Sequence, residues 1–140
     1  MTSKKKTDPV MLTENFALSE FRCGCGCDRH EQPEIVAALR RLCERRLQPI
    51  RDALGVSLRV HSGVRCEAFN KKCGGALRSQ HLFGVAADLV PHGGDIAAIG
   101  REARAIIAAL GCGGVKEYHR TTRISFCHVD DRRTTWDGNR

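Results

Sequence analysis

Apolar residues recur at helical spacing in the segment that follows Pro33, as Ile35, Leu39, Leu42 and Leu47. This period predicts an amphipathic helix that begins at Pro33, because proline is favoured in the first helical turn. Pro49 lies inside the same pattern. Proline lacks a backbone donor and clashes with the preceding turn, so we expect a kink or break there before the pattern resumes. Gly55 then provides a natural end to the helix.

Short alternating segments elsewhere predict β-strands. VSLRV at residues 56–60 and VAADLV at 85–90 are the first two, and CGGVKEY at 112–118 and RISFCHVD at 123–130 supply two more. Residues 61–79, between the first two strands, are rich in turn-forming residues throughout.

A second helix is predicted between the two pairs of strands, with Asp95 as its cap and Gly111 at its end. Its apolar positions are Ile96, Ile99, Ala103, Ile106 and Leu110. The resulting order of elements indicates an α+β fold with a small, mostly antiparallel sheet and flanking helices. A chain of 140 residues fits one domain, which we expect over residues 15–140 after a flexible tail at residues 1–14.

The charge balance is basic, with 23 lysines and arginines against 16 acidic residues and a net charge of +7. Such a surface suits polyanions: nucleic acid, an anionic membrane or an acidic cell wall. Residues 1–9, MTSKKKTDP, carry no apolar run after their positive start, which argues against a secretory signal peptide. No segment approaches the ~20 apolar residues of a membrane span. We therefore expect a soluble protein that is made in the cytoplasm and does not insert into membranes.

Eight cysteines are many for this length. Cys23, Cys25 and Cys27 lie in CGCGC, too close together to form disulfides with one another comfortably. Without an export signal, metal binding or reduced thiols explain the cysteines better than a disulfide framework does. One such interpretation is a second, structural zinc at these three residues. C-x-C spacing is less typical of zinc than C-x-x-C. A nucleic-acid-binding module is not expected, because C-x-x-C pairs and interleaved aromatic residues are missing.

Four side chains with useful chemistry fall at strand ends. His81 precedes the second predicted strand and Asp88 lies within it, while His128 and Asp130 share one face of the last strand. Two histidines and one carboxylate form a normal catalytic zinc set that leaves a fourth position for water. A lone histidine is nevertheless often a hydrogen-bonded core residue, and either aspartate could serve a turn or an ion pair. Spacing alone leaves both interpretations open.

The segment SQHLFGVAAD at residues 79–88 resembles the S-x-H-x-x-G-x-A-x-D signature of the M15 peptidase family. This family contains zinc D-alanyl-D-alanine carboxypeptidases and related cell-wall endopeptidases. All five fixed positions are present, as Ser79, His81, Gly84, Ala86 and Asp88. The wider resemblance spans residues 15–133 and includes SGVRC with Arg65, FN with Asn70, a GCGGVKEY segment and the late H-x-D.

The resemblance implies that His81, Asp88 and His128 bind one catalytic Zn²⁺. It assigns Arg65 to a substrate carboxylate, and Ser79 either to substrate or to bracing the loop. It further implies a zinc metallopeptidase, and thus a hydrolase, that cuts peptidoglycan stem peptides as a carboxypeptidase or an endopeptidase. We expect a monomer that acts on the cell wall after release from the cytoplasm, as a phage or prophage endolysin does.

One position departs from the family pattern. Many members carry Asp or Glu three residues before the last zinc histidine, where it acts as the general base, and here that residue is Ser125. Asp130 is the first candidate to replace it, and His119 and Glu117 are the second. Asp130 could equally orient His128. The alternative function is a zinc-containing wall-binding module of the same fold that lacks activity.

Overall fold

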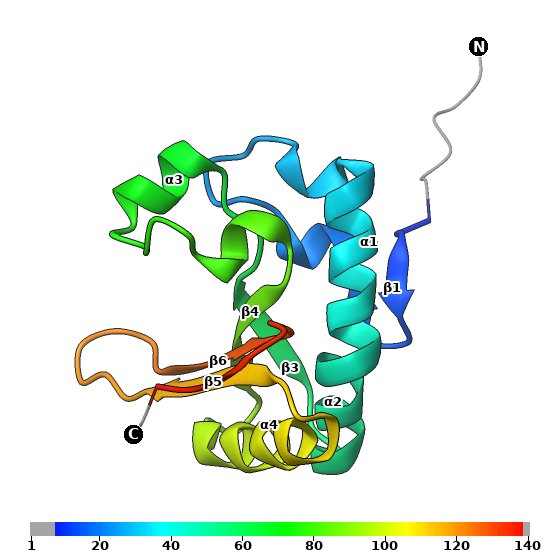
Figure 1. Ribbon diagram of the computed structural model, residues 1–140, viewed down its shortest axis with the longest axis vertical. Helices are drawn as coiled ribbons and strands as arrows, with labels where there is room; N and C mark the ends of the chain where they lie inside the picture. Colours follow the sequence, from blue (N-terminus) through cyan, green and yellow to red (C-terminus); the bar gives the residue numbers. More distant parts are fainter. Residues whose placement is uncertain (1–7, 139–140) are drawn as a thin grey trace.

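The computed structural model describes residues 8–138 (Figure 1). Its α-helices are α1 (Pro33–Leu42), α2 (Gln48–Leu54), α3 (Glu67–Lys72) and α4 (Ile96–Leu110). Its strands are β1 (Met11–Thr13), β2 (Phe16–Ala17), β3 (Leu58–Ser62), β4 (Ala86–Pro91), β5 (Gly113–Tyr118), β6 (Phe126–Asp130) and β7 (Thr135–Asp137). Single 3-10 turns lie at Leu18–Phe21, Arg29–Glu31 and Gln80–Phe83. The predicted α+β class is confirmed.

The main sheet has the order β3-β4-β6-β5-β7. Its pairs are antiparallel except for β5 and β7, which run parallel. The four strands predicted from sequence are β3, β4, β6 and β5, which lie next to one another, and β7 adds a fifth strand at the edge beside β5. The β1–β2 hairpin, α3 and β7 were not predicted, because each is too short to show a hydrophobic period.

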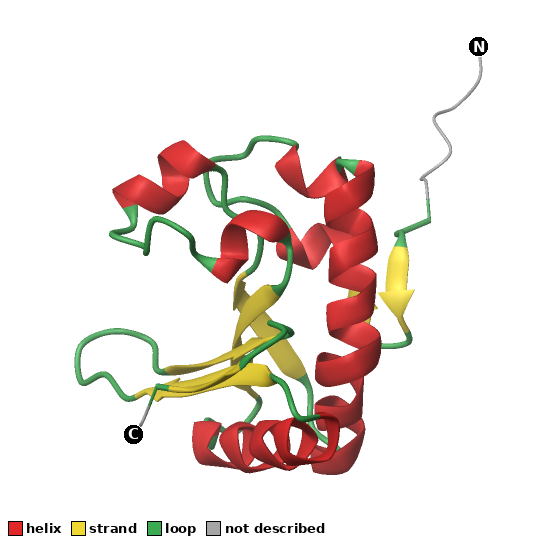
Figure 2. Cartoon of the chain, in the orientation of Figure 1, coloured by secondary structure: helices red, strands yellow, loops and turns green. Residues whose placement is uncertain are grey.

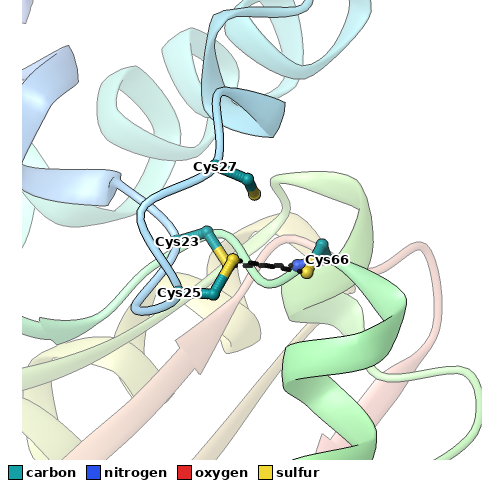
Figure 3. A group of neighbouring side chains, drawn as sticks. All are labelled: Cys23, Cys25, Cys27 and Cys66. Atoms are coloured by element: carbon teal, nitrogen blue, oxygen red, sulfur yellow. Dashed lines mark hydrogen bonds between the residues drawn. The ribbon is translucent and has the colours of Figure 1, made fainter.

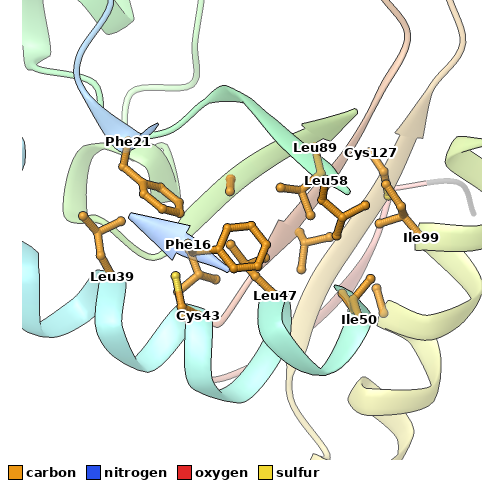
Figure 4. Packing of buried hydrophobic residues seen from close by; sticks show 14 of the residues in the cluster. Phe16, Phe21, Leu39, Cys43, Leu47, Ile50, Leu58, Leu89, Ile99 and Cys127 are labelled. Atoms are coloured by element: carbon orange, nitrogen blue, oxygen red, sulfur yellow. The ribbon is translucent and has the colours of Figure 1, made fainter. Parts of the chain in front are cut away.

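The long α1–α2 helix runs along one side of the sheet, and α4 crosses its end (Figure 2). The core lies between these helices and one sheet face (Figure 4). Leu89 and Cys127, which pair across β4 and β6, point into this core. Since side chains alternate along a strand, their neighbours Asp88 and His128 point to the opposite face. The helices thus leave one face of the sheet for polar residues.

Of the kink or break expected at Pro49, the break does not occur. α1 continues into α2 through a π-helical turn at Cys43–Leu47, which ends just before Pro49. A π turn changes the hydrogen-bond spacing where the proline ring would clash with the preceding turn. Gly55 ends α2 in the left-handed conformation, as predicted.

The folded part of the chain begins earlier than the predicted boundary at residue 15. Leu12 in β1 is 4% exposed and belongs to the core, and Arg40 of α1 donates to its carbonyl. Burial of this side chain anchors the hairpin, so at least Met11–Thr13 are structured. Residues 1–7 of the expected tail lie outside the described residues.

A buried ion pair ties the π turn to the end of β6. Arg46 donates from Nε to Asp131 Oδ1 over 2.7 Å, and Arg45 donates to the same carboxylate over 3.1 Å. The Arg46 side chain is 1% exposed, whereas that of Arg45 is 43% exposed. The two arginines therefore share one partner but differ in their access to water.

This difference yields a prediction. Arg46→Ala should lower the free energy of unfolding by about 3–5 kcal/mol, because it leaves a largely buried Asp131 without its closest cation. Arg45→Ala should cost less than ~1 kcal/mol, because an exposed pair is screened by water. Urea unfolding of the two variants measures both values, and equal losses would contradict the assigned roles.

Candidate metal centre

His81, Asp88 and His128 converge on the polar face of the sheet. Asp88 on β4 and His128 on β6 are cross-strand partners, and His81 comes from the 3-10 turn before β4. Asp88 Oδ1 lies 3.2 Å from His81 Nε2 and 3.0 Å from His128 Nδ1. All three residues are at most 9% exposed. One oxygen and two nitrogens are thus directed at a common point.

The outer nitrogens of both histidines have acceptors. His81 Nδ1 lies 2.7 Å from the carbonyl oxygen of Gly63, and His128 Nε2 lies 2.7 Å from Asp130 Oδ2. A carbonyl only accepts, so His81 carries a proton on Nδ1; a carboxylate holds the His128 proton on Nε2 in the same way. In the neutral rings the convergent nitrogens therefore present lone pairs toward Asp88. Three lone pairs that face one another are a donor set that fits a cation such as Zn²⁺.

The electrostatics of this set also favour positive charge. Burial alone would raise the pKa of Asp88, but the two histidines outweigh it and hold the pKa well below its usual range. Burial would lower the pKa of His128, yet Asp130 and Asp88 raise it to about 9. The carboxylates therefore stabilise a cation at this point, whether a proton or a metal ion.

Asp130 is fully buried, and its oxygens are occupied. Oδ2 accepts from His128 and from Arg132 Nη2 over 2.6 Å, and Oδ1 accepts from Arg132 Nε over 2.9 Å. Burial would raise the pKa of this carboxyl, but the hydrogen bonds from His128 and Arg132 hold it well below its usual range. A carboxylate so engaged is suited to orienting His128, and poorly suited to accepting a proton as a general base.

Small neighbours make room for Asp130. Its partners across the strands are Ala86 on β4 and Gly114 on β5. A Cβ on Gly114 would come within 2.7 Å of the Asp130 carboxyl carbon. The alanine of the S-x-H-x-x-G-x-A-x-D motif therefore lies beside the carboxylate that holds the last histidine.

Two other motif residues shape the turn that carries His81. Ser79 Oγ accepts from the backbone N–H of His81 over 3.3 Å, which caps the turn. Gly84 ends the turn with φ +71°, and a Cβ there would meet Ile35 of α1 at 3.0 Å. The glycine thus meets a conformational and a steric requirement at once. Ser79 braces this turn and also lines the cavity described below, so both roles expected for it remain predictions.

Arg65 lies beside the three convergent residues. Its Nη2 is 3.5 Å from the outer oxygen of Asp88, its Nη1 donates to Asn70 over 3.2 Å, and its Nε donates to Ser62 over 3.3 Å. These contacts fix the guanidinium in place. Because its side chain remains partly exposed, it can also meet an anionic group in the adjacent cavity.

A cavity of about 450 Å³ opens over the three convergent residues. Its wall carries four arginines, which are Arg65, Arg78, Arg120 and Arg132. Tyr118 and Phe126 also line it. Trp136 of β7 also lines it and packs edge-on against His128, with 5.7 Å between ring centroids. Apart from Asp88, no acidic side chain lines this cavity among residues 8–138.

The second-choice bases named from sequence are not brought to this cavity. Glu117 pairs with Cys127 and so lies on the core side of β5, where Arg104 binds both of its oxygens. The hydrogen bonds from Arg104 lower the pKa of Glu117. His119 is exposed in the loop after β5 and is not part of the cavity wall. Ser125, at the departing position, exchanges hydrogen bonds with the backbone of Arg120 and closes the same loop.

Two titratable residues near Asp88, His61 and Tyr118, were not among the site residues predicted from the sequence. His61, at an irregular position of β3, borders a second cavity of about 420 Å³ that Asp88 and Arg65 also line. The ring of His61 stacks on that of Phe126, with centroids 5.4 Å apart. The ring of Tyr118 also stacks on Phe126, with centroids 4.8 Å apart. Burial and then Arg59 lower the pKa of His61, whereas burial and then Asp88 raise the pKa of Tyr118. No local motif marks His61, because only the fold brings it to Asp88; Tyr118 ends the GCGGVKEY segment of the family resemblance, but no role followed for it from the sequence.

The contact between Asp130 and His128 predicts a measurable effect on metal affinity. Asp130→Asn should weaken Zn²⁺ binding about 10–100-fold, because an amide orients and polarises the imidazole less well than a carboxylate. Competition with a chromophoric chelator measures this affinity. Asp52→Asn, which makes the same charge change on the exposed side of α2, should leave it unchanged. Equal affinities for the Asp130 variant and the parent would refute the orienting role.

Comparison with known proteins adds one positive finding. The family model described as Peptidase M15 matches residues 11–130, which include the hairpin strand β1 and end at Asp130. No match was found among curated proteins.

Proposed function

Since the chain belongs to the peptidase M15 family, we propose that it is a zinc-dependent peptidase that hydrolyses peptide bonds in peptidoglycan stem peptides. The observation that carries this proposal is the convergence of His81 Nε2, Asp88 Oδ1 and His128 Nδ1, with outer partners that leave lone pairs for a metal. Three protein ligands in a cavity leave an open coordination position, as catalytic zinc requires.

Zinc bound there would polarise the scissile carbonyl and lower the pKa of a water molecule to about 7. The chain itself contributes the positioning. Arg65 holds a substrate carboxylate in its planar fork, and Asp130 keeps His128 in one tautomer. Tyr118, whose raised pKa keeps it protonated, donates a hydrogen bond to the oxygen that gains negative charge.

We assign the proton-transfer role left open by Ser125 to His61. Its lowered pKa keeps the imidazole neutral at pH 7, so it can accept a proton from the attacking water and pass it to the leaving amine. It lines the adjoining cavity of about 420 Å³, which shares Asp88 and Arg65 with the cavity over the metal centre, and it stacks on Phe126, the residue that follows Ser125. Asp130 is less suited because both of its oxygens are already hydrogen-bonded.

The charge of the cavity supports an anionic peptide as the substrate. Its wall carries four arginines, and the chain has a net charge of +7. Stem peptides of peptidoglycan offer several carboxylates, including the terminal one that a carboxypeptidase must recognise. Arginine is suited to such groups because its guanidinium binds a carboxylate through two parallel hydrogen bonds.

The runner-up is a wall-binding module that keeps the metal but does not cut. It is motivated by Ser125, whose hydroxyl is used to close a loop and cannot serve as a base.

Both functions require access to the cell wall. Among the helices of residues 8–138, none has the length and apolar character that a membrane crossing needs. We propose release from the producing cell by a separate pore, as for a phage or prophage endolysin.

Incubation with purified peptidoglycan distinguishes the two functions. The zinc-loaded protein should release new amine termini, and His81→Ala should reduce that release by at least a factor of ~100, because a metal ligand is lost. Mass spectrometry of the products tells a terminal D-alanine from an internal cut. Intact binding to peptidoglycan with no new termini would reject the enzyme and favour the module.

The role of His61 predicts a change in rate and in pH profile. His61→Gln should lower kcat about 10²–10⁴-fold with little effect on zinc content. In the parent, activity should fall as the pH drops through the lowered pKa of His61, since the protonated ring cannot accept a proton. The variant should lose this acidic limb.

His92→Gln is the matched control, because His92 is an exposed histidine that follows the far end of β4. It should keep the parent profile. An unchanged kcat in His61→Gln would exclude His61 as the acid–base group.

A further inference from the structure

Four cysteine sulfurs gather at a place outside the candidate metal centre. Cys23, Cys25 and Cys27 come from the CGCGC segment, and Cys66 lies just before α3 (Figure 3). The four Sγ atoms lie within 4.8 Å of one another. The sulfur of Cys25 is 3.4 Å from that of Cys23 and 3.7 Å from that of Cys66, although 41 residues separate Cys25 from Cys66. The fold therefore adds a fourth thiol to the three that the sequence places together.

The spacing of the sulfurs fits a tetrahedral metal. A Zn–S bond of about 2.3 Å puts neighbouring sulfurs of a tetrahedral site about 3.8 Å apart. The contacts of 3.4 and 3.7 Å are close to this value. A disulfide needs about 2.05 Å between sulfurs, and all four cysteines are free thiols.

The surrounding backbone supports sulfurs that carry negative charge. The N–H of Cys66 donates to Cys23 Sγ, and the N–H of Phe69 donates to Cys66 Sγ, each over 3.4 Å. Amide donors around the sulfur ligands are the kind of outer contact that orients a metal site. Gly24 and Gly26 let the segment fold tightly enough: a Cβ on Gly24 would strike the Phe69 ring, and Gly26 has φ +86°.

We infer that Cys23, Cys25, Cys27 and Cys66 bind a structural Zn²⁺. Four thiolates make a closed site with no position for water, which is the structural rather than the catalytic pattern. Soft sulfur ligands also select zinc over magnesium or calcium. The C-x-C spacing, which counted against zinc when three cysteines were considered, is accommodated because the fourth ligand comes from another part of the chain.

The inferred zinc fastens the segment that carries Arg65. Cys66 is the next residue, and Val64 donates its N–H to the carbonyl of Phe21, close to the start of CGCGC. Gly63, the residue before Val64, links this segment to the candidate metal centre, because its carbonyl accepts a hydrogen bond from His81 Nδ1. The cysteine site thus positions Arg65 and His81 without touching substrate.

Zinc content per chain tests this inference separately from the proposed function. The reduced parent should hold two zinc ions by elemental analysis. His81→Ala should hold one, Cys25→Ser should hold one, and the double variant should hold none. Cys25 is the residue of choice because it is exposed, so that its substitution leaves the core intact. Cys73→Ser, which removes an exposed thiol at the other end of α3, should still hold two.

Cobalt gives a readout that identifies the ligands. The cobalt-loaded parent should show a strong thiolate-to-metal charge-transfer band in the near ultraviolet. The band should persist in His81→Ala and weaken or shift in Cys25→Ser and in Cys66→Ser, whereas Cys73→Ser should keep it. If the catalytic zinc alone were absent, the parent would hold one zinc, and Cys25→Ser would hold none.

Two results would overturn the inference. One is a parent whose metal is lost entirely in His81→Ala and retained in full in Cys25→Ser. The other is a disulfide among the four cysteines, found by mass spectrometry of protein purified without reductant.

Discussion

The register between β4 and β6 is the constraint on which the polar face of this protein depends. It sets Asp88 opposite His128 and Ala86 opposite Asp130, so that one carboxylate stands between two histidines and another stands behind one of them. A shift of one residue would turn all of these side chains into the core. The apolar residues between them, Ala87, Leu89, Cys127 and Val129, resist that shift because the core already buries them.

The two faces of the sheet therefore have separate tasks. On one face, apolar side chains, the long α1–α2 helix and α4 supply stability, with Glu117 and Arg104 paired at the edge of this layer. On the other face, charged side chains are held close together and pack against the aromatic rings of Phe126 and Trp136. Asp88 and Asp130 can stay ionised there because histidine and arginine partners offset the cost of burial.

Much of this arrangement could be predicted from local patterns. The central strands and the helix from Asp95 to Gly111 follow from periodicity and caps, and His81, Asp88 and His128 were singled out by their places on these elements and by the motif around them. What could not be predicted depends on contacts distant in sequence. Glu117 lies two positions before His119 in an unremarkable strand, and only its pairing with Cys127 shows that it points into the core layer. His61 and Cys66 likewise acquire their neighbours only when β3 and the following segment meet residues from other elements. Leu12 was missed because a three-residue strand has too few positions to reveal a period.

The strand β7 begins after the region that matches the family model, which ends at residue 130. It nevertheless supplies Trp136 to the cavity wall, against His128 and beneath the guanidinium of Arg132. One wall of the cavity over the candidate metal centre is therefore built by a segment that lies outside the matched region. The backbone at Gly138 is hydrogen-bonded to Val115 in the same sheet, whereas β1 lies beyond α1 (Figure 1). The strand that follows the matched region is therefore held against the cavity wall by the sheet itself, whereas the strand that opens the matched region is separated from that wall by a helix.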